Sequence, residues 1–312
     1  MQIPSEIGRM PGIAELDLSR NHIAGTIPSE LFTMKNLKIL KLYANRLTGT
    51  LPTEVGLATR LTNLRLETNY LTGTIPTEVG VMSSLTELSF GFNRFGSKIP
   101  SQIGNLKQLK YLTFSKNSFS GRLPSELGGL DGIEILAVDN NLLFGSIPTE
   151  YGLLWTLREF HISASGVGGF LPTELGLMNS LELLDISYNN FRGPILTELG
   201  LLTNLRYLLL NNCQLSGKIP SQLGNCPNMT RFLIKDNVLT GTVPHTLGSL
   251  EQLVTFSMEA NQLTGSMPPE VCDLRANYAL SRLVADCPNS RTGVGVVCAV
   301  PTCCSFCRDT QK

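Results

Sequence analysis

The side chains that could carry out chemistry in this sequence are a histidine, an aspartate and two serines. A repeat of about 24 residues places them on neighbouring strands: His161, Asp185, Ser163 and Ser187. These are the parts of a hydrolase triad, but a triad also needs oxyanion donors and a sealed pocket, which an open sheet face does not supply. We therefore expect a contact between His161 and Asp185 that makes binding sensitive to mild acid. Hydrolysis stays a distant alternative.

Cysteine is the second reactive residue type, and most of the eight cysteines lie near the C-terminus. These are Cys272, Cys287, Cys298, Cys303, Cys304 and Cys307. A short cysteine-rich terminal segment is typical of a cap stapled by disulfides in an oxidising compartment, although the sequence does not determine the pairing. The alternatives are free thiols or zinc held by Cys303 or Cys304 with Cys307, but no histidine follows to complete a metal site. Cys213 and Cys226 occupy apolar positions of the repeat, so we expect small buried thiols there.

A third group of residues has the chemistry of a recognition surface. It consists of aromatic and charged side chains beside the regular apolar positions: Tyr43, Arg65, Phe92, Tyr111, Asp139, Trp155, His161, Asp185, Tyr188 and Tyr207. Aromatic side chains are frequent anchors for proteins and sugars. We expect these residues to bind a ligand, and we expect Trp155 to be exposed near the start of the strand that carries His161. The alternative is a solvated surface with scattered aromatic residues.

A tandem repeat positions these side chains, and residues 37–60 (LKILKLYANRLTGTLPTEVGLATR) are one copy of it. One column of the repeat is mostly asparagine: Asn21, Asn45, Asn69, Asn93, Asn117, Asn141, Asn189, Asn237 and Asn261. A second column is mostly proline: Pro28, Pro52, Pro76, Pro100, Pro124, Pro148, Pro172, Pro220, Pro244 and Pro268. About eleven copies follow one another without insertion or deletion, and such a period is the signature of a solenoid.

Each copy predicts a short strand, a turn and a short helical piece. Leu40 and Leu42 flank the polar Lys41, which is the period of a strand with one buried face. Each strand lies one repeat from its predecessor, so we expect a parallel sheet with about 4.8 Å between strands. Inward asparagines bond main-chain groups of adjacent coils, a glycine then takes backbone angles that side chains resist, and proline ends the segment. Thr53 and Glu54 after the proline resemble a helix start.

The pattern LxxLxLxxNxLxGxIPxxLGxL, as in residues 61–85 (LTNLRLETNYLTGTIPTEVGVMSSL), resembles the plant-specific class of leucine-rich repeat. Proteins of this class include receptor-kinase ectodomains, polygalacturonase-inhibiting proteins and algal secreted or membrane-anchored proteins. The resemblance implies an α/β solenoid, a right-handed superhelix of about 11 repeats of 24 residues with a parallel concave sheet and a convex side of 3-10 helices and turns. It also implies binding of peptides, steroids, carbohydrates or proteins through the inner sheet surface.

Composition narrows the range of partners. Lys and Arg together number 25, as do Asp and Glu, so the formal charge is zero and no basic excess favours nucleic acid. No apolar run approaches the roughly 20 residues that span a bilayer, so we expect no membrane contact by this segment itself. Residues 1–10 match the middle of a repeat and lack the apolar core of a signal peptide, so we expect a preceding segment that is missing here.

The sequence thus predicts a solenoid over residues 1–274 and a cysteine-rich cap over residues 275–312. We expect a non-enzymatic extracellular or cell-surface recognition module that needs no cofactor and binds a protein, peptide or glycan on its concave sheet. The triplet Asn228-Met229-Thr230 is a glycosylation signal, in keeping with secretion. One alternative is an inhibitor of a secreted hydrolase, which the resemblance to polygalacturonase inhibitors permits.

A further alternative is binding to ice or to a crystalline polysaccharide through ladders of threonine. The ladders are formed by Thr48, Thr50, Thr72, Thr74, Thr240 and Thr242. They are interrupted by Lys98, Arg122, Phe170 and Lys218.

Overall fold

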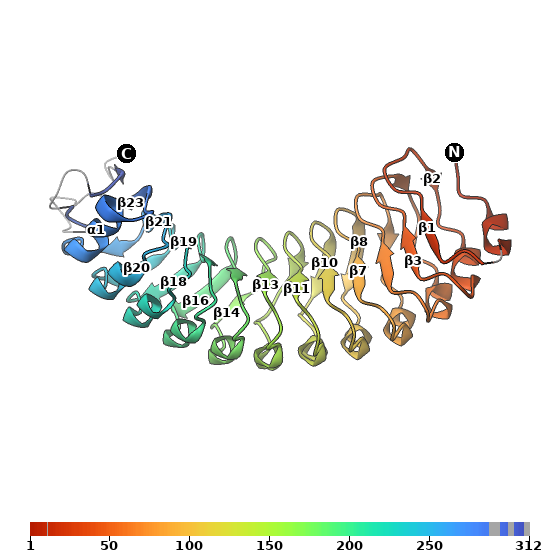
Figure 1. Cartoon of the computed structure of the whole chain (residues 1–312), viewed down its shortest axis with the longest axis horizontal. Helices are drawn as coiled ribbons and strands as arrows, with labels where there is room; N and C mark the ends of the chain where they lie inside the picture. Colours follow the sequence, from red (N-terminus) through yellow and green to blue (C-terminus); the bar gives the residue numbers. More distant parts are fainter. Residues whose placement is uncertain (11, 287–293, 299–302, 309–312) are drawn as a thin grey trace. The chain divides into compact units, whose positions relative to one another are not determined.

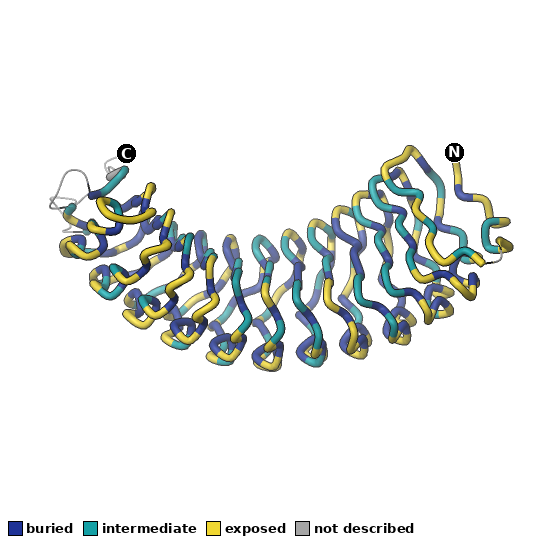
Figure 2. The backbone as a smooth tube through the Cα atoms, in the orientation of Figure 1, coloured by how far each residue is buried: buried dark blue, intermediate teal, exposed yellow. Residues whose placement is uncertain are grey.

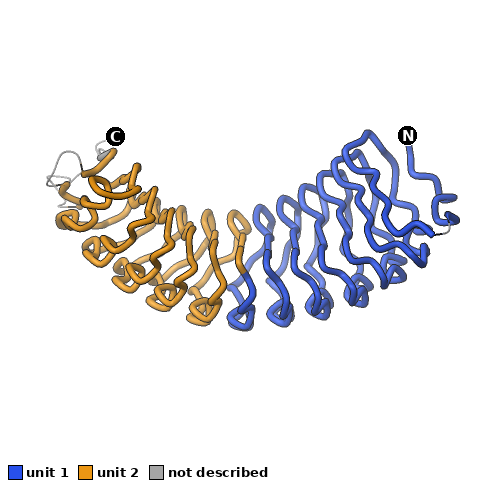
Figure 3. The backbone as a smooth tube through the Cα atoms, viewed as in Figure 1, with its two compact units in different colours: residues 1–157 blue, residues 158–312 orange. Residues whose placement is uncertain are grey.

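The computed structural model describes residues 1–312 except residues 11, 287–293, 299–302 and 309–312. The chain forms two compact units, Met1–Leu157 (unit 1) and Arg158–Lys312 (unit 2), which Figure 3 draws in separate colours. Both units are built from the repeat, with a strand and a 3-10 helix as predicted, and a second short strand between them where the sequence predicts only a turn (Figure 1). No helix among the described residues is long and apolar enough to cross a bilayer.

The main sheet of unit 1 is parallel, and its strands follow one another in chain order. Leu16 lies opposite Leu40, and Leu40 lies opposite Leu64, so neighbouring strands differ by one repeat. This confirms the predicted sheet of short strands. The strands are β1 (Glu15–Asp17), β3 (Ile39–Lys41), β5 (Asn63–Arg65), β7 (Glu87–Ser89), β9 (Tyr111–Thr113) and β11 (Ile135–Ala137).

A second row of short strands and a row of 3-10 helices complete each turn of unit 1. In the second row β4 pairs with β2, β8 with β6, and β10 with both β8 and β12. These strands are β2 (Ala24–Gly25), β4 (Arg46–Leu47), β6 (Thr72–Gly73), β8 (Arg94–Lys98), β10 (Ser118–Gly121) and β12 (Leu142–Leu143). The helices are η1 (Ser5–Arg9), η2 (Ser29–Thr33), η3 (Thr53–Leu57), η4 (Thr77–Val81), η5 (Ser101–Asn105), η6 (Ser125–Gly129) and η7 (Thr149–Leu153).

Unit 2 has the same organisation and ends in an α-helix and two further strands. Its main sheet contains β13 (Glu159–His161), β15 (Leu183–Asp185), β17 (Tyr207–Leu209), β19 (Arg231–Leu233), β21 (Thr255–Ser257), β23 (Arg282–Asp286) and β24 (Phe306–Arg308). Its second row contains β14 (Gly168–Gly169), β16 (Asn190–Pro194), β18 (Gln214–Gly217), β20 (Val238–Gly241) and β22 (Gln262–Leu263). Its helices are η8 (Thr173–Leu177), η9 (Thr197–Leu201), η10 (Ser221–Asn225), η11 (His245–Ser249) and α1 (Pro269–Asn277).

The core of each unit is a stack of the apolar columns that the repeat predicts. In unit 1 the side chains of Leu40, Leu64 and Leu88 are fully buried on successive strands. Four phenylalanines add an aromatic stack whose ring centroids lie 5.2 to 6.2 Å apart: Phe90, Phe95, Phe114 and Phe119. Figure 2 shows the resulting alternation of buried and exposed segments in every turn. Burial of these columns is the main force that stabilises the coil.

The asparagine column forms the predicted ladder of hydrogen bonds between adjacent turns. Asn45 is buried, and its Nδ2 donates to the carbonyl oxygens of Leu18 at 2.9 Å and Leu42 at 3.1 Å. Its Oδ1 accepts a hydrogen bond from the N–H of Ile23 at 3.0 Å. The side chain therefore satisfies main-chain groups in its own turn and in the previous one, which would be costly to bury unpaired.

The helical pieces begin where the sequence predicts. Helix η3 starts at Thr53, directly after Pro52, and Glu54 lies in its first turn. Its N-cap makes no side-chain hydrogen bond, and Thr53 Oγ1 donates to Glu54 Oε2 at 3.5 Å. Its start is set by the fixed φ of proline, which is −66° at Pro52.

The C-terminal segment extends the main sheet of unit 2 and carries disulfides. Strand β23 pairs with β21, with Thr255 opposite Arg282, and α1 precedes it in place of a 3-10 helix. Disulfides join Cys272 to Cys303 and Cys298 to Cys304. Of the other cysteines predicted to pair, Cys287 and the side chain of Cys307 lie outside the described residues. The boundary between residues 274 and 275 stays a prediction.

The two cysteines inside the solenoid, Cys213 and Cys226, are buried free thiols. Cys213 takes the place of an asparagine in the ladder, and its Sγ lies 3.5 Å from the carbonyl oxygen of Ile186. Burial raises the pKa of each thiol to about 11. Both are therefore protonated at neutral pH and act as small apolar side chains.

Candidate functional site

The candidate binding surface is the side of the main sheet whose side chains point away from the core. In β3 the middle residue, Leu40, is buried, whereas Ile39 and Lys41 are partly exposed. The middle residue is buried in every main-sheet strand from β3 to β21, because successive side chains of a strand point to opposite faces. We call the outward surface the open face. It comprises the first and third residues of each strand and the exposed or partly exposed residues just after it, such as Tyr43.

At the start of unit 1, the carboxylates of Glu15 and Asp17 pair with Lys41 on the open face. Lys41 Nζ lies 2.8 Å from Glu15 Oε1 and 3.7 Å from Asp17 Oδ2. The hydrogen bond to Glu15 raises the pKa of Lys41. Hydrogen bonds from the hydroxyl and then the N–H of Ser19 lower the pKa of Asp17. These groups are therefore charged and paired at neutral pH.

The predicted residues Tyr43 and Arg65 are in contact on the open face. The Arg65 guanidinium lies 4.5 Å from the centroid of the Tyr43 ring, an arrangement in which a cation is attracted to the ring face. It also pairs with Glu67, and its Nε lies 3.3 Å from Glu87 Oε1. Desolvation lowers the pKa of Arg65, but the hydrogen bond and charge of Glu67 and the charge of Glu87 outweigh this effect and raise the pKa. Arg65 is thus held in place as part of a preformed surface.

Further along unit 1, the open face is a row of hydroxyl groups and one carboxylate. Thr113 Oγ1 donates to Ser89 Oγ at 2.8 Å. Ser115 Oγ donates to Asp139, which follows the next strand, β11. Because each of these groups retains further hydrogen-bonding capacity, the row can bond the polar groups of a ligand laid along the sheet.

Two exposed aromatic rings flank this row. The Tyr111 hydroxyl donates to Glu134 Oε2 at 3.3 Å, and 38% of the residue is exposed. The Phe92 ring is 52% exposed, and Lys116 Nζ lies 4.4 Å from its centroid. Large exposed aromatics on a polar surface are typical anchors for a partner. The structure therefore places Tyr111, Phe92 and Asp139 on one face of unit 1.

In unit 2 the structure corrects the predicted contact between His161 and Asp185. The two residues are opposite each other in adjacent strands, but His161 Nε2 lies 3.0 Å from Glu159 Oε2. Asp185 Oδ1 instead accepts hydrogen bonds from the N–H of Ser187 at 3.0 Å and from its hydroxyl at 2.5 Å. The short aspartate turns back to its own main chain, whereas the longer glutamate reaches the imidazole. Ser187 is therefore held by Asp185 and not by the histidine, so these groups do not form a triad.

The tyrosines predicted for unit 2 are on or beside its open face. Tyr207 is the first residue of β17, and its ring centroid lies 5.7 Å from the Arg206 guanidinium and 5.8 Å from that of Arg231. Tyr188 follows β15 with a positive φ of 56° and is largely exposed. This backbone conformation is unusual for a bulky residue, and here it directs the chain out of the strand.

Two predicted site residues lie away from the open face. Trp155 is 63% exposed, but it lies in the turn after η7. There its main-chain N–H donates to the carbonyl oxygen of Leu153 at 2.9 Å. Asn228 is exposed, and its Nδ2 donates to the carbonyl oxygen of Thr203 at 3.0 Å. It lines a polar pocket of about 440 Å³ in unit 2 with Arg158 and Arg206. Trp155 is therefore exposed shortly before β13 in the chain, as the sequence predicts, and its part in ligand binding stays a prediction.

The described residues contain no cluster of three or more His, Cys, Asp or Glu side chains that could hold a metal ion. The open face itself offers hydrogen bonds, paired charges and aromatic rings.

The fold has counterparts among known proteins. The profile of the family described as leucine-rich repeat region matches residues 91–228, and a single leucine-rich-repeat profile matches residues 13–34. The chain is a leucine-rich-repeat protein, similar to the receptor-like ectodomains of plants. No curated protein matches it by sequence.

Solved structures similar to this chain include two plant receptors and a plant ice-binding protein. The plant peptide hormone receptor RGFR1, in complex with RGF2, is 30% identical with a TM-score of 0.88, over 91% of this chain and 45% of the receptor chain. The ectodomain of the Arabidopsis receptor kinase HAESA, in complex with an extended IDA peptide hormone, is 31% identical with a TM-score of 0.86, over 91% of this chain and 47% of that chain. The ice-binding protein is 25% identical with a TM-score of 0.65, over 73% of this chain and 74% of its own. This chain thus spans roughly half the length of the two receptors.

Proposed function

We propose that this chain is an extracellular recognition module that binds a peptide or a protein on its open face. The observation that carries the proposal is the contrast between a regular buried face and a chemically varied outward face on the same strands. Core packing does not require Tyr111, Asp139 or Tyr207, whereas a partner would use an aromatic anchor and fixed polar groups. The similarity to two peptide hormone receptors supports a peptide ligand in particular.

The open face of unit 1 suits an extended peptide for a geometric reason. Its hydroxyl row and paired charges follow the direction in which the strands are stacked, so a chain laid across them meets a new turn about every 4.8 Å. The Ser115 hydroxyl is already oriented by Asp139, and Arg65 is already held by Glu87. Preformed groups lose little conformational freedom when a ligand binds, which favours affinity.

An extracellular location is part of the proposal. Disulfides such as that between Cys272 and Cys303 form and persist in oxidising compartments. In that location the segment would act as a receptor-like binding domain, in keeping with its similarity to the two plant receptors.

A screen of secreted peptides and extracellular proteins against the purified chain tests this function. The test variants replace open-face aromatics by alanine, Phe92 with Tyr111 in unit 1 and Tyr188 with Tyr207 in unit 2. We expect at least one double variant to lose about tenfold or more in affinity, as is usual for aromatic anchors. The matched controls are Tyr70→Ala and Phe170→Ala, which remove exposed aromatics that lie next to strands of the second row. A ligand whose affinity falls in the controls and not in the test variants would contradict the proposal.

A second candidate function rests on a flat array of threonines in unit 1. The exposed residues Thr26, Thr50 and Thr74 recur on successive turns. A Cβ on Gly49 would lie 2.8 Å from Thr26 Cγ2, and a Cβ on Gly73 would lie 2.7 Å from Thr50 Cγ2, so each threonine methyl is seated on the next glycine. Regular spacing of methyl and hydroxyl groups, together with the similarity to a plant ice-binding protein, supports adsorption to ice.

Loss of ice-growth inhibition in Thr50→Lys, and its retention in Tyr111→Ala, is the expected result. Absence of inhibition in the wild-type chain would exclude it.

A further inference from the structure

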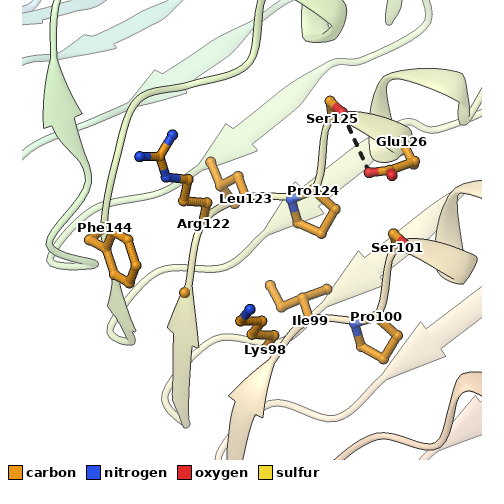
Figure 4. Close-up of a pocket in the computed structure, with 11 residues that line it drawn as sticks. Lys98, Ile99, Pro100, Ser101, Arg122, Leu123, Pro124, Ser125, Glu126 and Phe144 are labelled. Atoms are coloured by element: carbon orange, nitrogen blue, oxygen red, sulfur yellow. Dashed lines mark hydrogen bonds between the residues drawn. The ribbon is translucent and has the colours of Figure 1, made fainter.

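A groove on the second row of strands in unit 1 has no role in the function proposed above. It has a volume of about 550 Å³ and lies beside β8, β10 and the residues after β12. We call it the basic groove, and its lining includes Lys98, Arg122, Phe144, Ser125, Glu126, Pro100 and Pro124. Figure 4 shows Phe144, Arg122 and Lys98 toward one side of the groove and Ser125 and Glu126 toward the other. All of these residues belong to unit 1, and none is on the open face.

The two cations of the basic groove are positioned by glycines. A Cβ on Gly121 would lie 2.9 Å from Lys98 Cγ, and a Cβ on Gly145 would lie 3.2 Å from Arg122 Cγ. Because neither glycine has a side chain, each aliphatic stem lies flat over the next turn of the solenoid. The charged heads of Lys98 and Arg122 are thus presented on successive turns and remain exposed to solvent.

These two cations differ from those on the main sheet in their pairing. Within the described part of the chain, neither Lys98 nor Arg122 has a carboxylate within ion-pair distance. Lys41, Arg65 and Lys110 each have one. An anionic ligand in the groove would therefore meet two cations that no internal partner neutralises, and it would displace no existing salt bridge.

The rest of the groove specifies the kind of anion. The Phe144 ring is 54% exposed, and its flat apolar surface can stack against the face of a sugar ring. Glu126 and Ser125, which are joined by a hydrogen bond of 3.5 Å, can bond sugar hydroxyls. An acidic peptide of the same charge offers the cations the same carboxylates, but it lacks the ring hydroxyls that Ser125 and Glu126 can bond. A glycan that carries both carboxylates and hydroxyls can satisfy the cations, the ring and the glutamate together.

We propose that the basic groove binds an acidic polysaccharide, a chain of uronic acid sugars. A uronate carboxylate bonds Arg122 or Lys98, an adjacent sugar ring stacks on Phe144, and hydroxyls reach Ser125 and Glu126. Because strands of the second row repeat along unit 1, the polymer lies across successive turns. This site is separate from the open face, so the chain could be held on an acidic matrix while it binds another ligand.

The experiment measures binding of a labelled, size-defined oligogalacturonate to the full chain at low and at physiological salt. The comparison probes are a neutral xylan oligosaccharide of the same length and an oligoglutamate peptide of the same charge. We expect binding of the oligogalacturonate only, weakening as salt rises, because the contacts are between exposed charges. Arg122→Ala should weaken it about tenfold, as loss of a charge-assisted hydrogen bond does, and the double variant of Lys98 and Arg122 should weaken it further.

Lys218→Ala is the matched control. Lys218 occupies the same repeat position in unit 2. A Cβ on Gly241 would lie 3.1 Å from its Cγ, so its aliphatic stem lies over the next turn as those of Lys98 and Arg122 do. The preceding and following copies carry Pro194 and Thr242 there, so this lysine has no neighbouring cation in its column. We expect its replacement to change affinity less than twofold, because an exposed cation outside the groove contributes little to binding. Phe144→Ala tests the sugar ring contact and should reduce affinity several-fold.

Three outcomes would overturn the proposal. One is equal loss in Lys218→Ala and Arg122→Ala, which indicates attraction to any surface cation. Another is oligoglutamate binding as tight as oligogalacturonate binding, which indicates an acidic peptide site. The third is no oligogalacturonate binding by the wild-type chain. Thermal melting of each variant checks folding, and the open-face double variant Phe92→Ala/Tyr111→Ala should bind the oligogalacturonate normally, so this site and the open face can fail independently.

Discussion

The interior of the repeat and the open face belong to the same short strands but obey different constraints. In β9 the middle residue, Leu112, is fully buried in a column of apolar residues, whereas Tyr111 beside it is exposed. The interior positions recur because each turn must offer the same surface to the next. The outward positions bond their neighbours on adjacent strands in varied ways, as Thr113 does with Ser89 and Arg65 with Glu87, and no shared packed interior restricts them to one residue type. The comparison separates residues that determine the coil from residues that are free to recognise a partner.

The largest expected effect on stability comes from the aromatic stack inside unit 1. Phe119 is fully buried, and its ring lies 5.2 Å from that of Phe114 and 6.2 Å from that of Phe95. Phe119→Ala should lower the free energy of unfolding by about 3–5 kcal/mol, because a cavity replaces the ring. Urea denaturation followed by circular dichroism measures this. A loss below about 1 kcal/mol would mean that the interior tolerates a cavity. Interior and open-face residues would then differ little in their contribution to stability.

A smaller loss is expected from the asparagine ladder. Asn117 donates to the carbonyl oxygens of Phe90 and Phe114 and accepts from the N–H of Phe95, each at 3.0 Å. Asn117→Ala should cost about 2–3 kcal/mol, since main-chain groups lose their partners in a partly buried site. Asn105→Ala, at an exposed helix position, is the matched control and should cost less than about 0.5 kcal/mol. Equal losses in the two variants would refute the structural role of the column.

The buried thiols predict a dependence of stability on alkaline pH. Burial raises the pKa of Cys226 from 9.0 to about 11, so folding favours the protonated thiol. Its contribution is therefore complete below pH 9 and is lost as the pH rises toward 11, by about 1–2 kcal/mol. Other groups titrate in this range, so the measurement is the difference between the wild type and Cys226→Ala. Parallel stability curves for the two proteins between pH 8 and 11 would show that the thiol ionises freely in the fold.

The smallest effect on stability is expected on the open face. Tyr111 makes one side-chain hydrogen bond, to Glu134, and Phe92 projects beside Lys116. Phe92→Ala and Tyr111→Ala should each change the free energy of unfolding by less than about 0.5 kcal/mol. Urea denaturation in parallel with the Phe119→Ala variant checks this. A loss of 2 kcal/mol or more in either would place these aromatics among the structural residues.

The sequence predicted the fold well because the same pattern of apolar, asparagine, glycine and proline positions recurs in almost every copy of the repeat. Leu40 and Asn45 each stand in a column, and the column predicts strand, ladder and register together. The exposure of Trp155 could be predicted from its polar column, but a single aromatic in such a column carries no periodic signal that says whether it binds a partner. The partner of His161 could not be deduced either, since Glu159 and Asp185 are both within reach and side-chain length decides between them.

The basic groove could not be predicted from the sequence for a related reason. In the sequence, Lys98 and Arg122 only interrupt a column of threonines. Their juxtaposition with Phe144 depends on how the turns stack, and the absence of carboxylate partners becomes apparent only from distances. Pairs of cations one repeat apart, each followed by glycine on the next turn, are the sequence signal that could have identified them.

The most direct test of the account measures binding and stability in one variant. The Phe92→Ala/Tyr111→Ala protein should bind a peptide recovered from the screen about tenfold or more weakly, while its free energy of unfolding stays within about 0.5 kcal/mol of the wild type for each substitution. The Tyr70→Ala protein should match the wild type in affinity. Unchanged affinity in the double variant, or a loss of affinity accompanied by an equal loss of stability, would contradict the claim that the open face is the recognition surface.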